Sequence, residues 1–203
     1  MPADRTASLA SRFSSQLSQG IASAYEVLVE RLGDPVEMRH VPAVPTLDGW
    51  RDRGETACYL RTEASQISRA FGPDLIVSCP HVIVNTDSIV LDPLTWHGTV
   101  RHPRARQVSV AYRVVISLTE GRISRIEGHR HWSTSKHDLR LWLEAVELTG
   151  GFHPPKARPG AAAGSVAPDW RSLLVLNACR HMCAGEGPKR TIAQLLTRPA
   201  SDI

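Results

Sequence analysis

The chain has 203 residues, 42% of them hydrophobic, and a formal net charge of +4. This length suffices for one globular domain with a hydrophobic core and an appended segment. The surplus positive charge follows residue 150, where seven Lys or Arg accompany three Asp or Glu. A nucleic-acid-binding domain would carry its basic residues on the folded body, so we expect no nucleic-acid partner.

The first seventy residues have the apolar spacing of helices. The spacing predicts one long helix or two abutting helices over 6–32, with Gly20 as the weak point. A short strand is expected over 36–42. A further helix is expected over about 49–71, with Asp48 placed to cap its first turn. The apolar positions of the first region are Leu9, Phe13, Leu17, Ile21, Tyr25, Leu28 and Leu32.

The apolar period changes from 3.6 to 2 after residue 74. This change predicts successive strands joined by turns at "NTDS", "HPRAR" and "TEGR". The strand segments are "LIVSCPHVIVN", "SIVLDPLTWHGTVRH", "QVSVAYRVVISL" and "RISRIEGHRHWS". A last helix over 135–148 would place Leu139, Leu143 and Val146 on one side. Helices followed by an antiparallel meander indicate an α+β domain.

The segment "GGFHPPKARPGAAAGSVAP" has no periodicity and reads as a linker. We therefore expect a compact domain over residues 1–152 and a helical C-terminal extension over 153–203. The helical pieces of the extension are too short to form a domain alone, so they are expected to dock on the body or on a second subunit.

Four cysteines are too few and too scattered for a secreted disulfide framework. Cys179, His181 and Cys183 in "CRHMC" have a spacing that could bind a metal, although small apolar residues on a short helix are the favoured interpretation. No Gly-rich phosphate loop follows a strand, so no organic cofactor is implied. No segment approaches the length of a signal peptide or a membrane span, and we expect a soluble, cytoplasmic protein.

The order of these elements resembles the nuclear transport factor two-like superfamily. This superfamily includes SnoaL-like polyketide cyclases, ketosteroid isomerases, scytalone dehydratase and limonene epoxide hydrolase. The segments "DPVEMRHVPAVP", "TWHGTVRHP" and "QVSVAYRVVISLTEGRISRIEGHRHW" look most like the last branch, and the resemblance covers roughly residues 22–150. It implies a cone-shaped, curved antiparallel sheet wrapped on the N-terminal helices, with a cavity on the concave side.

The resemblance also implies positions for a site. The catalytic residues of the epoxide hydrolases fall at His97, His131, Thr95, Met38 and His40, so every one of them is replaced here and epoxide opening by that machinery is not expected. His40, His97 and His131 would instead project into the cavity as proton-transfer groups, as pocket histidines do in scytalone dehydratase. Further candidates for substrate binding are His81, Tyr25 and Tyr59, together with Met38 and Thr95.

Each candidate has a simpler interpretation. The histidines could be hydrogen-bonded structural residues, and the tyrosines could be core residues with satisfied hydroxyl groups. Three converging histidines could also bind zinc, but their sequence spacing does not support this, and we predict no metal site. His129 is expected to be solvated or to lie in an interface.

Alternation places Trp96 and Trp132 opposite His97 and His131, on the convex face. Since that face commonly forms the dimer interface in this superfamily, a homodimer is expected. The leading prediction is a cofactor-independent lyase, isomerase or cyclase that acts on a small apolar polyketide-, terpene- or steroid-like molecule. The alternatives are a non-catalytic ligand-binding or assembly module, and an epoxide hydrolase with a rearranged site.

Overall fold

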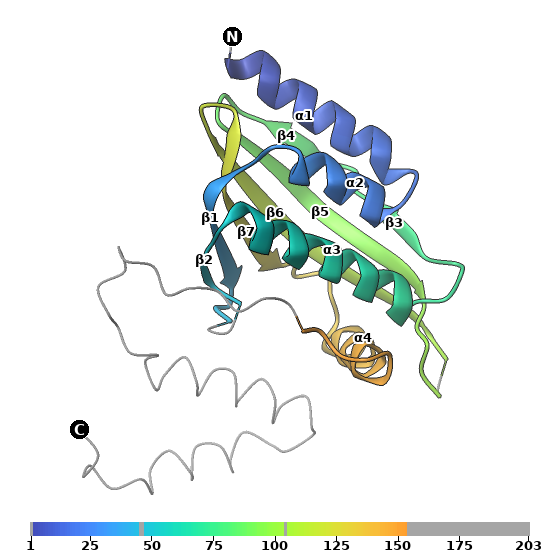
Figure 1. The fold of residues 1–203 in the computed structure, drawn as a ribbon. Helices are drawn as coiled ribbons and strands as arrows, with labels where there is room; N and C mark the ends of the chain where they lie inside the picture. The colour runs from blue at the N-terminus through green and yellow to red at the C-terminus, as the bar shows by residue number, and fades with distance from the viewer. Residues whose placement is uncertain (1, 45–46, 104, 154–203) are drawn as a thin grey trace, which may run out of the picture. The chain divides into compact units, whose positions relative to one another are not determined.

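The computed structural model describes residues 2–44, 47–103 and 105–153 (Figure 1). The strands of this part form one seven-stranded sheet in the order β2-β1-β7-β6-β5-β3, and β4 also pairs with β5. The predicted α+β class is confirmed, with β1 parallel to β7 in an otherwise antiparallel sheet. The elements are α1 (Pro2–Leu17), α2 (Ile21–Val29), β1 (Leu32–Val41), β2 (Gly49–Arg51), α3 (Arg53–Ala70), β3 (Ile76–Ser78), β4 (Val82–Val84), β5 (Ser88–Thr99), β6 (Gln107–Thr119), β7 (Arg122–Arg130) and α4 (Lys136–Leu148).

The N-terminal helical region is divided into α1 and α2 at the predicted place. Gly20 has a φ of +116°, a conformation that L side chains rarely adopt, and the chain turns there between the two helices. Leu9, Phe13 and Leu17 of α1 are buried, as their spacing of four residues predicts.

Helix α3 begins four residues later than predicted. Asp52 is its N-cap, and the side chains of Asp52 and Glu55 accept each other's backbone N–H in a capping box. The prediction that Asp48 caps this helix is wrong. The three residues of β2 intervene, and the Asp48 carboxylate binds His40 and the backbone of Val44 instead.

The sheet has one helix-covered face and one open face. Figure 1 shows α2 and α3 lying across the strands on one side, and the core lies between them and the sheet. The core residues of this helix-covered face include Met38, Leu94, Trp96, Val108, Val110, Ile116 and Ile126. The open face carries ion pairs instead, such as Glu37 with Arg39 and Arg125.

Strand β5 changes its alternation part-way along. Ile89 and Leu91 are buried before a register irregularity at Asp92 and Pro93, whereas Leu94 and Trp96 are buried after it. An extra residue in a strand moves every later side chain to the other face. Trp96 is therefore only 3% exposed and faces the helices, so its predicted place on the convex face is wrong.

Two predictions about single elements need correction, and one about a turn is confirmed. The segment predicted as one strand before β5 forms two strands, β3 and β4, which both pair with β5. The buried side of α4 is made by Leu141, Ala145 and Val146, whereas Leu143 is exposed. The predicted tight turn at "TEGR" is present, and Glu120 and Gly121 both have positive φ there.

The predicted extension over 153–203, including the "CRHMC" segment, lies outside the described residues except for His153. The boundary at residue 152 stays a prediction. None of the described helices is long and apolar enough to cross a membrane.

Candidate functional site

His40 is the centre of a polar cluster on the helix-covered face. Strand β1 places it beside Gly128 of β7, two residues beyond the buried Met38 on the same face. Its Nδ1 lies 2.6 Å from Asp48 Oδ1, and its Nε2 lies 3.1 Å from the Tyr59 hydroxyl. Both ring nitrogens therefore have partners from different elements.

The contacts of Asp48 assign the tautomer of His40. Asp48 Oδ2 accepts the backbone N–H of Val44 at 2.9 Å, while Oδ1 faces the imidazole. An ionised carboxylate only accepts hydrogen bonds, so Nδ1–H of His40 donates to it. Nε2 is then the acceptor, and the Tyr59 hydroxyl donates to it.

The ring of Tyr59 is held between two side chains, those of Arg51 and Phe152. The guanidinium carbon of Arg51 lies 5.0 Å from its centroid, and Phe152 packs edge-on at 5.4 Å. The segment that carries Phe152 is held on α3 because Gln66 donates a hydrogen bond to the Gly151 carbonyl. Tyr59 therefore has little freedom to move away from His40.

Glu63 lies one helical turn after Tyr59 on α3. Burial is the main cause that raises the pKa of its carboxyl, while His40 and a hydrogen bond from Tyr25 oppose this rise. Burial and the nearby Glu63 also hold the pKa values of the Tyr25 and Tyr59 hydroxyls well above their usual range. We call His40, Asp48, Tyr25, Tyr59 and Glu63 the His40 cluster.

Gly128 leaves room for a methyl group beside His40. A Cβ placed on Gly128 would meet only His40 Cδ2, at 3.9 Å. Glu63 and Tyr112 also keep some accessible area although both lie deep in the domain. A separate hollow of about 540 Å³ lies between α1 and α2 and includes Ser11, Gln16 and Ser23, with no member of the His40 cluster.

The structure divides the predicted site residues between the two faces. His40, Tyr25, Tyr59 and Met38 lie on the helix-covered face. His97 and Thr95 lie on the open face, since they alternate with the buried Trp96. The expectation that His97 projects into the same cavity as His40 is therefore wrong.

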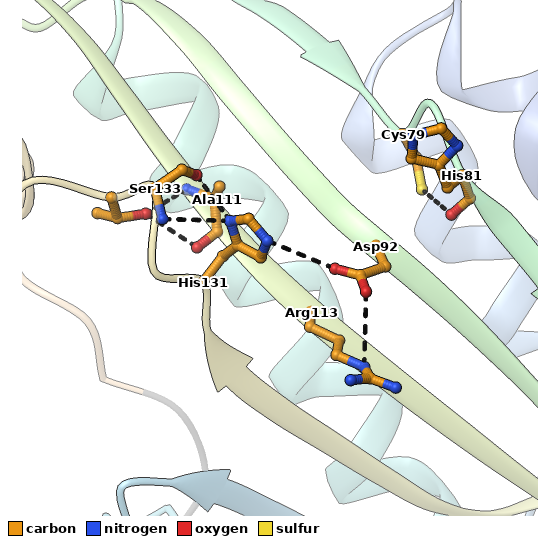
Figure 2. A network of polar contacts seen from close by, with 8 residues as sticks. Cys79, His81, Asp92, Ala111, Arg113, His131 and Ser133 are labelled. Carbon is orange, nitrogen blue, oxygen red and sulfur yellow. Dashed lines mark hydrogen bonds and ion pairs between the residues drawn. The ribbon is translucent and has the colours of Figure 1, made fainter.

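His131 also lies on the open face. Figure 2 shows its ring in front of the sheet, with Asp92 and Arg113 on the same side and α3 behind the strands. Its Nε2 is 3.7 Å from Asp92 Oδ1, and its Nδ1 is 2.7 Å from the Ser133 hydroxyl. Strand β7 ends at Arg130, so His131 lies just after the strand and does not project toward His40.

His81 is exposed between β3 and β4, where its carbonyl accepts from the Cys79 thiol and the backbone of Asp92 (Figure 2). Within the described part of the chain, no contact joins the His81 side chain to another predicted site residue. His129 pairs with Glu127 on the open face, in agreement with its predicted place outside the pocket. Across residues 2–44, 47–103 and 105–153, no group of three or more His, Cys, Asp or Glu could hold a metal ion.

Two members of the His40 cluster were not predicted. Glu63 had a signal in the sequence, because an acidic residue four positions after Tyr59 falls on the apolar stripe of a helix. Asp48 had no such signal. Its proximity to His40 depends on the loop between β1 and β2, whose course the sequence pattern does not specify.

No protein-family model matches the chain, and no curated protein matches it in sequence. The chain is similar to an NTF2-like protein of unknown function from Cytophaga hutchinsonii, with 12% identity, a TM-score of 0.46, and 64% of this chain and 98% of that one covered. A proposed SnoaL-like polyketide cyclase from a Jannaschia species has 14% identity and a TM-score of 0.45, with 62% and 84% covered. A proposed ketosteroid isomerase from Kribbella flavida has 13% identity and a TM-score of 0.40, with 65% and 82% covered.

These proteins carry the names of groups that the sequence resembles. At such low identity, an activity for this chain has to be inferred from its own side chains.

Proposed function

We propose that the chain is an enzyme that moves protons on a small, largely apolar organic molecule, with His40 as the general base and acid. The observation that supports this role is the contact of both ring nitrogens, Nδ1 with Asp48 and Nε2 with Tyr59. A base held in one tautomer by a carboxylate is the arrangement that general acid–base catalysis needs. Asp48 would stabilise the imidazolium that forms when His40 takes a proton.

The reaction begins at a carbon next to a carbonyl group. The Tyr59 hydroxyl first turns its O–H from Nε2 to the carbonyl oxygen of the substrate, which frees the Nε2 lone pair. His40 Nε2 then takes the proton, the C–H electron pair moves into the carbonyl, and an enolate forms. The raised pKa values of the Tyr25 and Tyr59 hydroxyls keep them protonated, so they act as hydrogen-bond donors and not as bases. In the reaction the enolate oxygen replaces Glu63 and His40 as their acceptor. Return of the proton to another carbon gives isomerisation, and its transfer to a departing hydroxyl gives dehydration.

Proton exchange on a simple ketone tests this proposal. The probe is 2-tetralone in D₂O, and proton NMR measures the loss of the signals next to its carbonyl. The intact chain should accelerate this exchange over buffer, and His40→Ala should reduce the acceleration about 100-fold, since a general base contributes factors of that order. Asp48→Asn should give an intermediate loss because the imidazole loses its orienting acceptor.

A matched control is His137→Ala, which removes an exposed imidazole at the first turn of α4. It should leave the exchange rate unchanged. Full exchange activity in His40→Ala would refute the proposal. Binding of 2-tetralone without exchange would favour a ligand-binding module, and formation of a diol from an epoxide probe would favour a hydrolase.

His97 and His131 were predicted to be catalytic, and their position on the sheet changes this prediction. Because both lie on the open face, we propose that neither takes part in exchange at His40, and alanine at either position should preserve the rate. A loss comparable to that of His40→Ala would show that the open face is part of the reaction site.

A homodimer through the open face remains our proposal for the assembly. Trp132, next to His131, is 88% exposed and would offer a large apolar surface to a second copy of the chain. Trp96 no longer supports this interface, since it lies in the core.

A further inference from the structure

A cation, Arg130, lies two residues along β7 from the glycine beside His40. Gly128 and Arg130 are two residues apart on the same strand, so their side-chain positions share the helix-covered face and their Cα atoms are about 7 Å apart. Gly128 has no side chain to fill the space next to the imidazole. A flat molecule lying on Gly128 would therefore touch His40 at one end and approach Arg130 at the other.

Arg130 begins on the same face of the sheet as the site. It pairs across the sheet with Tyr112, whose ring stacks on Trp96 at 5.3 Å in the core. Burial raises the pKa of the Tyr112 hydroxyl, and the charge of Arg130 opposes this rise. Arg130 itself is exposed, so it stands where the covered face meets solvent.

The other charged groups of this region do not neutralise Arg130. The structure records no ion pair or hydrogen bond for its guanidinium within residues 2–44, 47–103 and 105–153. Asp48 is bound to His40 and Val44, and Glu63 accepts from Tyr25. The guanidinium is thus a planar donor available to an anionic group.

We infer that the molecule bound at His40 carries a carboxylate, and that Arg130 binds this carboxylate and sets the orientation of the ligand. The ligand class is a flat, mainly apolar carboxylic acid. Its ring system lies over Gly128 and its acid group lies at the solvent-facing end of β7. This inference rests on the proposed site at His40 and names the class of substrate for it.

A pair of probes that differ only in charge tests this assignment. The probes are 2-naphthoate and 2-naphthamide, which have the same ring and nearly the same shape, and calorimetry measures their dissociation constants. The chain should bind the acid about tenfold more tightly than the amide, since charged hydrogen bonds exceed neutral ones but are weakened by exposure to solvent. Added salt should reduce the difference.

Substitutions on β7 distinguish a specific contact between Arg130 and the carboxylate from a general attraction of anions to the chain. Arg130→Gln should remove the preference for the acid, and Arg130→Lys should retain part of it. Arg122→Gln changes an exposed arginine at the other end of the same strand and should leave the preference intact. Equal affinity for the two probes, no binding of either, or an undiminished preference in Arg130→Gln would overturn the inference.

The two proposals can fail separately. His40→Ala should keep the preference for 2-naphthoate, because the imidazole does not contact the carboxylate. Arg130→Gln should keep the exchange of 2-tetralone, which has no carboxylate. A chain that prefers the acid but exchanges no protons would retain the binding role of Arg130 and lose the proposed catalytic role of His40.

Discussion

At the scale of single residues, Glu63 is a carboxyl group whose environment differs from water. It is an acidic side chain on the core side of α3, between His40 and Tyr25. Burial penalises its ionised form, so the folded chain holds the Glu63 proton to a higher pH than the unfolded chain does. A neutral carboxyl at this place would be a hydrogen-bond donor beside the substrate, in addition to the tyrosine hydroxyls.

This raised pKa predicts how stability depends on pH. Between the unfolded and folded pKa values of Glu63, the folded state binds more protons, so the free energy of unfolding falls as pH rises, by up to about 1.4 kcal/mol per pH unit. Glu63→Gln removes this loss and keeps an acceptor for Tyr25. The variant should have the same melting temperature as the unmodified chain in acid and a higher one near neutral pH.

Thermal unfolding across this pH range measures the effect. Glu147→Gln, an exposed position on α4, serves as the control and should follow the unmodified chain at every pH. A Glu63→Gln curve parallel to that of the unmodified chain would mean that the carboxyl ionises as freely in the fold as in water.

The sequence predicted some residues of the site and not their arrangement. His40, Tyr25 and Tyr59 were named, and each contacts another member of the cluster. His97 was assigned to the wrong face, although the alternation of Leu94, Trp96 and Val100 with polar residues carried the correct signal. That signal was outweighed by a family correspondence that did not allow for the extra residue at Asp92 and Pro93.

At the scale of elements, the long strands and helices were predictable, whereas β3 and β4 were predicted as a single strand and β2 was not predicted. β5, β6 and β7 are long enough for alternation to identify them, and α1 and α2 have regular apolar spacing. β2, β3 and β4 have too few residues to show a period. They form because a longer neighbour offers backbone donors and acceptors, as β5 does to β3.

Gly98 shows how closely β5 approaches the chain that leads into β3. A Cβ on Gly98 would meet three backbone atoms of Asp74 and Leu75 at 3.1–3.2 Å. Backbone atoms cannot move away by a change of rotamer, so Gly98→Ala should lower the free energy of unfolding by about 1–3 kcal/mol. Gly54→Ala in the first turn of α3 meets its nearest atom at 3.4 Å and should raise it by about 0.5 kcal/mol.

Urea unfolding of the two alanine variants measures this contrast. Equal stability of the two variants would show that the segment before β3 moves to admit the methyl group.

At the scale of the whole molecule, the two faces of the sheet serve different purposes. The helix-covered face holds the core and the His40 cluster, whereas the open face carries ion pairs and exposed side chains. The separation follows from alternation, since polar residues such as Glu37 and Arg125 share one face while their neighbours pack under the helices. Chemistry on one face can therefore coexist with assembly on the other.

The proposed dimer can be tested by removing its exposed aromatic residue. Sedimentation velocity should show a dimer of the unmodified chain, and Trp132→Ser should shift the population toward monomer. Leu148→Ser removes an exposed apolar residue at the end of α4 and should leave the dimer intact. A monomer at all accessible concentrations, or an unaffected dimer in Trp132→Ser, would exclude this interface.

The two contacts that hold the Tyr59 ring have an evolutionary consequence. Arg51 and Phe152 hold the carbon skeleton of the side chain, and neither contact requires its oxygen. A phenylalanine in its place would keep these contacts and lose only the link to His40. One nucleotide change could therefore abolish or alter the proposed reaction with little loss of stability. A single substitution would then separate a catalytic form of this fold from a form that only binds its ligand.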